Sequence, residues 1–580
     1  MVYPNSALNL LRQITAQINT EKFVQTLLLI FGLFTANLAR AQEVVENVGN
    51  LRPTLPQFVQ QEEQETFELP RIAEGQTTGA SGNQPTFRLN DVTFSGNQIV
   101  SSGTLKEVIS KYIGKMISVS ELESIRVALT QFYVSAGYIN SGVILPSQDV
   151  NNGIIKFQVI EGVLNKINIV GMDDLAPGYI ERRLLPHPSA AFNLNEFQER
   201  YQLLLNDPMF EKFQGQFRPG NRPGESILDL KVVPASPFGL TMQADNYGSA
   251  SSGEGQLSLN GYYLNPLGVG DNIALNLRKR EGALSGNLMY QLPLNHHDTR
   301  LTVQFGFNDS EVIEDQIEVL DIESEYQSTD VSLSHPVINS LTESLLLAGS
   351  LSVRENEGRL LQLPFSFAAG ENNGFSRVSA LRLSAQGSIR TDKDVWSGHI
   401  RYSHGLTAFN ATDNNNERPD SDFSSLLLQL QYARLLSHGV QLSVRADAQF
   451  SSDGLLPLEQ FAIGGANTIR GYRENELVRD EGYSASIQIA SPLFDELDFS
   501  GRYGKLDAYL FSDYGEGKFK ADVQDSDRTL WSAGIGLIWE PISGWQIEAA
   551  FAHAFKTPPT RANSVLQDDG IHVRISGVLF

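Results

Sequence analysis

The chain has 580 residues, a formal net charge of −23 at pH 7 and no cysteine. This charge disfavours a nucleic-acid partner, which requires a basic surface, and the lack of cysteine excludes disulfides, thiolate metal sites and a cysteine nucleophile. Hydrophobic residues make up only 41% of the chain. That is too few for a bundle of helices that each need about 20 apolar residues to cross a membrane, whereas barrel strands need only one apolar face.

Residues 1–41 predict a signal peptide. An apolar run over 23–34 follows Lys22, and Ala39-Arg40-Ala41 has the small-x-small pattern of a cleavage site. A membrane anchor is the alternative interpretation, but the run is shorter than the roughly 20 residues that span a bilayer. The mature chain is therefore expected to begin at Gln42.

Residues 42–85 predict a linker. This segment is acidic, rich in glutamine and interrupted by prolines, and it lacks a sustained apolar period. A short helix over 57–67 is the one candidate element within it, because a weak apolar pattern recurs there at helical spacing.

Residues 86–162 predict a small α+β domain with the order β-α-α-β-β. A short helix near Leu105 follows the first strand, and a longer helix is expected to open with a capping box of Ser120 and Glu123 and to end at Gly137. Strands are expected over 87–94, 143–145 and 154–160.

The same order restarts over 163–236. A helix near Tyr179 precedes a second helix opened by Asn193, and strands are expected over 167–171, 213–217 and 227–233. Gly96 and Gly171 follow the first strands of the two units and lie 171 − 96 = 75 residues apart. The spacing indicates an internal repeat.

Residues 237–580 predict an all-β transmembrane barrel. The sequence alternates with period two; for example, the apolar residues Leu301, Val303, Phe305 and Phe307 share one face of a segment. About 16 antiparallel segments of about 10 residues are expected, an even number typical of outer-membrane barrels. A soluble sandwich is the alternative, in which the polar face would meet bulk water.

Loops, aromatic residues and the last strand also favour a barrel. Long polar loops are expected over 308–323, 408–421 and 452–481, between tight turns at the other end. Aromatic residues stand near segment ends, as in an interfacial girdle: Tyr262, Tyr263, Trp531, Trp539 and Trp545. The final Phe580 resembles the terminal signal of such barrels. Since it has the opposite parity to Ile575, either Gly577 carries a bulge or Phe580 faces the lumen.

Two motifs stand in the barrel region. The longest loop contains Ile469, Arg470, Gly471 and Tyr472, and a strand further on carries Phe511, Asp513 and Gly515. Taken alone, these motifs fit a functional contact and a solvated surface loop equally well, since surface charge pairs contribute little to stability. With two upstream repeats and a barrel, they resemble the superfamily of POTRA-plus-barrel transporters. The resemblance implies that the loop folds into the lumen, that Arg470 pairs with Asp513, and that Gly471 permits a tight tip.

Two further segments resemble one branch of that superfamily, the haemolysin activation/secretion proteins of two-partner secretion. They are Asp245-Asn246-Tyr247-Gly248 and Asn265-Pro266-Leu267-Gly268. The resemblance implies a pore in the bacterial outer membrane, with two POTRA-like domains in the periplasm. Such a pore recognises an unfolded adhesin- or haemolysin-type exoprotein and secretes it to the cell exterior. Lipid and the exoprotein are the expected partners, and no nucleic acid, catalytic residue, cofactor or metal is expected in a monomeric pore.

Other functions remain open from the sequence. A barrel-assembly insertase is the main alternative. A porin would leave the two repeats unexplained, and a membrane-embedded hydrolase would need a nucleophile motif such as Gly-x-Ser-x-Gly, which is absent.

Two interpretations are also open for Phe197, Tyr201 and Leu204 in the second repeat. In one interpretation they line a groove for apolar client residues. In the other they are core residues, and their spacing of three and four residues favours this second interpretation. Relatives plug the resting lumen with an N-terminal helix, and 57–67 is the candidate for this role.

Overall fold

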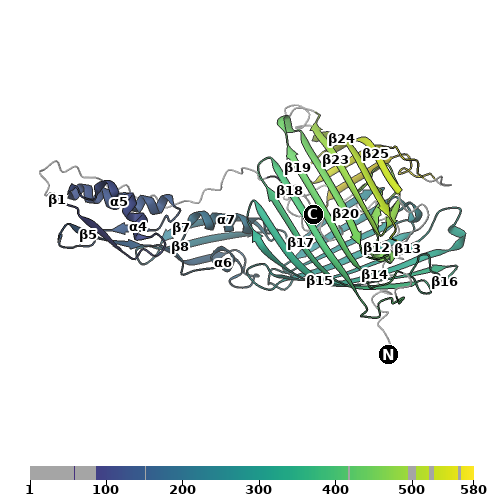
Figure 1. The fold of residues 1–580 in the computed structure, drawn as a ribbon, viewed down its shortest axis with the longest axis horizontal. Coiled ribbons are helices and arrows are strands. Elements are labelled where there is room, and N and C mark those ends of the chain that lie inside the picture. Colours follow the sequence, from purple (N-terminus) through teal and green to yellow (C-terminus); the bar gives the residue numbers. More distant parts are fainter. Residues whose placement is uncertain are drawn as a thin grey trace.

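The computed structural model describes Phe58 and residues 86–150, 152–415, 419–493, 504–520, 528–558 and 564–580. Figure 1 shows two small α+β units in a row, leading to one end of a large barrel. The predicted signal peptide, the linker and the candidate plug helix lie outside the described residues, apart from Phe58. In the part of the chain that is described, no helix is both long and apolar enough to cross a membrane.

The first unit has two helices packed on a three-stranded sheet. Its elements are β1 (Thr86–Arg88), β2 (Asp91–Ser95), α4 (Ser102–Val108), η1 (Ser110–Tyr112), β3 (Met116–Ser118), α5 (Val119–Ser135), β4 (Gly142–Ile144) and β5 (Ile154–Ile160). The sheet order is β2-β5-β4, with β2 parallel to β5. The apolar stripe of α5 packs on the sheet because its residues recur every three or four positions, and Leu122, Ile125, Leu129 and Tyr133 are buried.

The longer helix begins two residues earlier than the sequence predicts. Ser118, not Ser120, is its N-cap, and Ser118 and Glu121 form the capping box. Both serines precede a glutamate by three residues, so the pattern alone allows either start. The short β3 strand decides between them, because it pairs with β1 up to Ser118 and the helix starts directly after it.

A pair of serine substitutions tests this cap. Ser118→Ala is expected to destabilise the first turn of α5 by about 1 kcal/mol, since the side chain accepts a hydrogen bond from the Glu121 N–H. Ser120→Ala is the matched control and should have a smaller effect. Amide hydrogen exchange of residues 119–123 in the whole chain measures the difference, and equal protection in the two variants would refute the assignment.

The second unit repeats the arrangement. Its elements are β6 (Val163–Val170), α6 (Tyr179–Leu184), α7 (Leu194–Leu205), β7 (Phe210–Pro219) and β8 (Glu225–Pro234), with sheet order β6-β8-β7. Asn193 caps α7, as the sequence predicts. In the two units β2 and β6 run parallel to the last strands β5 and β8, and the penultimate strands β4 and β7 lie at an edge of their sheets.

Sixteen antiparallel strands close into a barrel, which confirms the predicted fold class. The strands are β9 (Phe238–Asp245), β10 (Gln256–Leu264), β11 (Asn272–Arg280), β12 (Ala283–Pro293), β13 (Arg300–Glu311), β14 (Ile322–Asn339), β15 (Glu343–Leu360), β17 (Phe375–Arg390), β18 (Asp394–Leu406), β19 (Ser424–Leu435), β20 (Gln441–Ser451), β23 (Glu481–Pro492), β24 (Lys505–Lys518), β25 (Arg528–Glu540), β26 (Trp545–Ala554) and β27 (Ile571–Val578). The two-residue β16 (Leu363–Pro364) pairs beside β15.

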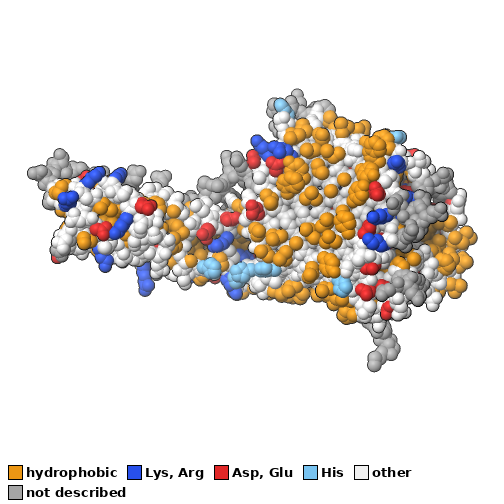
Figure 2. All heavy atoms as spheres, viewed as in Figure 1, with side chains coloured by type: hydrophobic (Ala, Val, Ile, Leu, Met, Phe, Trp, Pro, Cys, Tyr) orange, Lys and Arg blue, Asp and Glu red, His pale blue; other side chains and the backbone are white. Residues whose placement is uncertain are grey.

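The outer face of the barrel is apolar. Side chains there are half exposed, such as Leu383 (55%) and Ile400 (52%), while their neighbours Arg382 and Ser403 on the inner face are buried. Figure 2 shows the hydrophobic side chains spread over the barrel wall, with charged side chains concentrated towards its two ends. Because alternate strand residues face opposite sides, this pattern suits a wall with lipid outside and a polar lumen inside.

The connections differ at the two ends of the barrel. Strand β9 starts beside the second unit, so the three predicted long loops all emerge at the far end, as 312–321, 407–423 and 452–480. The connections at the near end include short turns such as 340–342 and 391–393. This division is typical of barrels with periplasmic turns and exterior loops.

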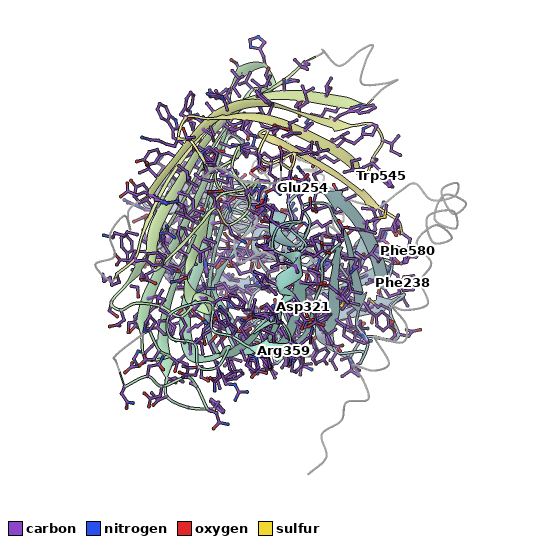
Figure 3. All side chains as sticks on the ribbon, turned by 90° about the vertical axis from the view of Figure 1, so that its right-hand side faces the viewer. Phe238, Glu254, Asp321, Arg359, Trp545 and Phe580 are labelled. Carbon is purple, nitrogen blue, oxygen red and sulfur yellow. The ribbon has the colours of Figure 1, made fainter. Side chains whose placement is uncertain are left out.

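The seam between the first and last strands is short and reinforced. Strands β9 and β27 share five residue pairs. The side chain of Asn246 adds hydrogen bonds across the seam, donating to the Ile571 carbonyl and accepting from the Val573 N–H, both at 2.8 Å. Glu254, in the loop that follows β9, connects to the loop that precedes β27. Glu254 lies inside the ring in Figure 3, where its carboxylate accepts hydrogen bonds from the N–H groups of Leu566 and Gln567.

Two aromatic expectations need correction. Tyr262 is not a girdle residue, because it packs against the core of the second unit. Phe580 neither faces the lumen nor follows a bulge at Gly577: pairing is regular there, β27 ends at Val578, and Phe580 is 54% exposed. Its ring lies beside that of Phe238 on the outer wall (Figure 3), because the two residues beyond the strand leave the alternation.

Candidate functional site: a loop inside the barrel

The loop between β20 and β23, residues 452–480, folds back into the barrel. We call it the lumen loop. It contains η5 (Pro457–Glu459) and a small hairpin of β21 (Phe461–Ile463) and β22 (Leu477–Arg479). Between the hairpin strands lie Ile469, Arg470 and Tyr472, which are 0%, 4% and 2% exposed. A loop this enclosed has a defined position, since each buried polar group needs a partner.

Arg470 and Asp513 form a bidentate ion pair. The Nε and Nη2 atoms of Arg470 lie 2.8 Å from the two carboxylate oxygens of Asp513, and the backbone N–H of Arg470 donates to the same carboxylate at 3.1 Å. Gln488 and Ser486 of the neighbouring β23 each accept one further guanidinium hydrogen, at 2.8 and 3.1 Å. Such a charge-assisted fork fixes both distance and orientation.

Alternation along β24 brings the other two motif residues to the same inner face. Phe511 stacks its ring 3.4 Å from the Arg470 guanidinium carbon, and Gly515 leaves space for the lumen loop. A Cβ atom at Gly515 would stand 2.9 Å from Ile463 and 3.2 Å from Ile469. The spacing of Phe511, Asp513 and Gly515 thus provides a stacking surface, a counter-charge and a gap along one face.

Gly471 and Tyr472 attach the loop tip to the last strands of the barrel. Gly471 has φ +89° and donates its N–H to His572 on β27 at 2.9 Å. A side chain at this position would be strained, and its Cβ would lie 2.9 Å from Ala552. The Tyr472 hydroxyl lies 3.0 Å from the carbonyl oxygens of Trp531 and Lys556, and accepts from the Lys556 N–H at 3.2 Å.

Tyr472→Phe isolates the contribution of that hydroxyl. The substitution removes the acceptor of the partly buried Lys556 N–H and a donor to the nearby carbonyls, which is expected to cost about 0.5–1.5 kcal/mol locally. Hydrogen exchange of residues 553–557 should become faster, while residues 428–432 on the other side of the barrel serve as an internal control. Unchanged exchange at 553–557 would mean that the hydroxyl does not hold this end of β26.

Sequence reasoning missed a second arginine of the tip. Arg473 donates to both carboxylate oxygens of Asp568 at 2.8 and 2.7 Å, and to Glu314 at 3.0 Å. These partners lie in two other exterior loops, 95 and 159 residues away in sequence. The hydrogen bond to Asp568 raises the pKa of Arg473, so the guanidinium stays charged. The adjacent Glu474 is partly buried, and this burial raises its pKa to about 7.

The second unit is docked on the near rim of the barrel through the turn 265–271. The Ala176 N–H donates to the Gly268 carbonyl at 2.6 Å, and Arg183 donates to Asp298 at 2.7 Å. Arg183 also stacks 3.6 Å from the Tyr179 ring, whose hydroxyl donates to Asp207 at 2.9 Å. Burial raises the pKa of Asp207. The Asn265-Pro266-Leu267-Gly268 segment singled out in the sequence therefore belongs to this joint.

A cavity of about 990 Å³ lies at this joint, between the second unit and the barrel rim. Its lining combines Arg200 of α7 with Gln386 and Ser388, which share the inner face of β17 with Arg382. The cavity therefore connects the surface of the second unit with the barrel interior.

The predicted client groove on α7 is wrong as far as its three named side chains are concerned. Phe197, Tyr201 and Leu204 are 1%, 4% and 4% exposed and pack in the core of the second unit. Their spacing at three and four residues places them on the face of the helix that covers the sheet. The alternative interpretation as core residues holds.

Within the described ranges, no group of three or more His, Asp or Glu side chains is arranged to hold a metal ion. The arginines of the lumen-loop tip are instead engaged in ion pairs: Arg470 with Asp513, and Arg473 with Asp568 and Glu314.

Comparison with known families decides which branch this architecture represents. Residues 224–538 match the model described as haemolysin secretion/activation protein ShlB/FhaC/HecB, and residues 87–162 match the ShlB-type POTRA domain. The chain belongs to the ShlB/FhaC/HecB family. This confirms the resemblance drawn from the two motifs and the repeats. As a ShlB/FhaC/HecB protein it is an outer-membrane translocation pore that secretes a partner exoprotein, with its POTRA domains in the periplasm.

Individual relatives agree with this assignment. The outer membrane transporter CdiB of Escherichia coli O6:K15:H31 is 24% identical over 473 residues, covering 79% of this chain and 78% of CdiB. The heme/hemopexin transporter protein HuxB of Haemophilus influenzae strain 86-028NP is 23% identical and covers 79% and 81%.

Solved structures support the fold. CdiB from Escherichia coli has a TM-score of 0.66 at 22% identity, covering 88% of this chain and 93% of CdiB. BamA from Haemophilus ducreyi, solved without POTRA domains 1–3, has a TM-score of 0.53 at 14% identity and covers 85% and 100%. The similarity to the assembly protein is thus weaker than that to the secretion transporter.

Proposed function

We propose that this chain is the dedicated secretion pore of one large exoprotein of the adhesin or haemolysin class. The observation that carries the proposal is the lumen loop, which is fixed by Arg470 and Asp513 inside a closed barrel whose near rim carries a POTRA-like unit. In this proposal residues 86–162 and 163–236 are the two POTRA domains, residues 237–580 the barrel, and residues 1–41 and 42–85 the signal peptide and linker.

The client enters from the second POTRA domain. An extended client segment binds by strand addition to a sheet edge of the POTRA domains, through main-chain hydrogen bonds. Such binding needs no fixed side-chain sequence. The cavity at the joint then leads from this domain to the inner face of the barrel.

Transport of this kind needs no catalytic step, so the pore is not an enzyme. Direction comes from folding of the client outside the cell, which prevents its return. In this proposal the pore acts as a monomer, and its apolar outer wall contacts outer-membrane lipid. A client mutant that cannot fold and is still secreted at the full rate would contradict the proposed source of direction.

Clean deletion of the chain in its native host tests the proposed function. One large exoprotein should disappear from the medium, while the amounts of other outer-membrane barrels stay unchanged. Simultaneous loss of many barrels would instead identify an assembly factor. A deletion that alters neither fraction would contradict both functions.

A further inference from the structure

The lumen loop contacts the barrel wall at a second place, remote from Asp513. The short helix η5 ends at Glu459, whose two carboxylate oxygens accept hydrogen bonds from Arg382 on β17 at 2.6 and 2.9 Å. Arg354 on β15 adds a hydrogen bond at 3.3 Å. Glu459 is 8% and Arg382 4% exposed, so this ion pair is nearly as enclosed as that of Arg470.

The two contacts lie far apart on the wall. Counted from β9, strand β17 is the eighth of the barrel and β24 the thirteenth, a separation of 13 − 8 = 5 strands. The loop itself leaves the barrel between the eleventh and twelfth strands, β20 and β23. Glu459 and Arg470 therefore attach the loop on opposite sides of its origin, and the segment between them crosses the interior.

Charge explains why a loop carboxylate is needed at the first of these places. Arg354, Arg382 and Arg401 project inward from three adjacent strands, and Arg401 acts electrostatically on the same Glu459. The Nε atoms of all three guanidiniums are buried and have no hydrogen-bond partner among the residues that the structure describes. Like charges enclosed together repel strongly unless a counter-charge is present.

The wall offers little compensation of its own. Asp330 on β14 influences Arg354 and Arg401, but among the described residues no hydrogen bond joins it to either. If neutralising the three arginines served only the stability of the barrel, a carboxylate on a neighbouring strand would be sufficient. Here it comes from the lumen loop, so the same contact that neutralises the wall also fixes the loop.

We propose that Glu459 is a positioning residue of the pore: it forms, with Arg382 and Arg354, a second anchor that holds the lumen loop across the channel. The loop is thus held at Glu459 on one side of its origin and by its tip on the other, and loss of the Glu459 anchor lets the segment around Glu459 swing about the tip and opens the channel. The proposal extends the proposed secretion function, because passage of a client requires this loop to move.

Conductance of the purified full chain in planar lipid bilayers tests the anchor without any client. Glu459→Gln keeps the side-chain size but removes the charge, and it is expected to raise the frequency of channel opening by about tenfold, the factor that corresponds to losing one charge-assisted contact. Glu459→Asp, which retains the charge on a shorter side chain, should give a smaller increase. Asp453→Asn is the control, since Asp453 is an exposed carboxylate of the same loop with serine partners nearby.

A double-mutant comparison of Glu459 and Arg382 distinguishes a positioning role from general destabilisation of the barrel. Arg382→Gln should also raise the opening frequency, and the double variant with Glu459→Gln should open no more often than the stronger single variant, because both remove the same contact. Heat-modifiable mobility in electrophoresis verifies that each barrel is folded; if Glu459→Gln does not fold, the Arg382→Gln and Glu459→Asp recordings decide in its place.

A frequency equal to that of Asp453→Asn, or multiplied effects in the double variant, would overturn the proposal. Because the recordings contain no exoprotein, their outcome is independent of whether deletion of the chain abolishes secretion.

Discussion

Arg470→Ala is expected to lower secretion of the exoprotein by at least about tenfold, the largest effect of any single side chain in the barrel. The substitution leaves Asp513, which has no exposed surface, without its counter-charge. Removing one partner of a buried ion pair costs about 3–5 kcal/mol. That exceeds the 1.4 kcal/mol that corresponds to a factor of ten in the population of the anchored loop.

Two companion variants sharpen this prediction. Arg470→Lys should also fail, because an ammonium group cannot reproduce the two parallel bonds to Asp513 or the stacking on Phe511. Arg434→Ala is the control, since Arg434 is half exposed and pairs only loosely with Asp394 at 3.5 Å. Immunoblots of client in the medium, normalised to folded barrel, give the readout. If Arg470→Ala secretes the exoprotein at the wild-type level, the anchoring of the lumen loop by Arg470 is not required for secretion.

Gly270→Ala is expected to reduce secretion nearly as much, by displacing the second α+β unit from the barrel. A Cβ at Gly270 would stand 2.2 Å from the Tyr179 ring. That ring cannot move aside easily, because it is 8% exposed, is stacked by Arg183 and is hydrogen bonded to Asp207. Residues 174–179 should then become sensitive to protease while the barrel stays folded.

Gly114 supplies a matched control for Gly270. Both glycines have φ +82°, but a Cβ at Gly114 would meet no atom within 4 Å. Gly114→Ala therefore introduces the same backbone strain, about 1 kcal/mol, without a collision. Equal secretion by the two variants would show that the joint tolerates displacement.

The periodic parts of this chain were predictable. Alternation over 237–580 follows directly from a wall with lipid on one side and a polar interior on the other, and the structure has the expected number of strands. Helix boundaries were predictable to within two residues: the overlapping capping patterns at Ser118 and Ser120 could be separated only by the pairing of β3 with β1.

Contacts within the lumen were less accessible to sequence reasoning. The pairing of Arg470 with Asp513 was implied only by resemblance to a family. No comparable signal existed for Glu459, whose partners Arg382 and Arg354 are 77 and 105 residues distant and belong to strands with many inward polar residues. The strand register determines which arginines meet the loop, and that register depends on closure of the whole barrel.

For the apolar stripe on α7 the sequence contained a signal, but the signal had two interpretations. Phe197, Tyr201 and Leu204 have the chemistry of a peptide-binding groove and the spacing of a core, and burial decides between these interpretations. In contrast, the Asn265-Pro266-Leu267-Gly268 turn had no assigned structural role in the sequence. Its role at the joint follows from close approaches there: a Cβ at Gly268 would stand 2.8 Å from the Asp174 carbonyl oxygen, and one at Gly270 would stand 2.2 Å from the Tyr179 ring.

Site-specific photo-crosslinking during secretion tests most directly whether the client passes through the barrel. A benzoylphenylalanine in place of Ser384 would lie on the inner face of β17, and one in place of the adjacent Leu383 on the outer face. We predict that the exoprotein crosslinks to position 384 and not to position 383. Crosslinks from position 383 alone, or none from the inner face while secretion continues, would contradict transport through the lumen.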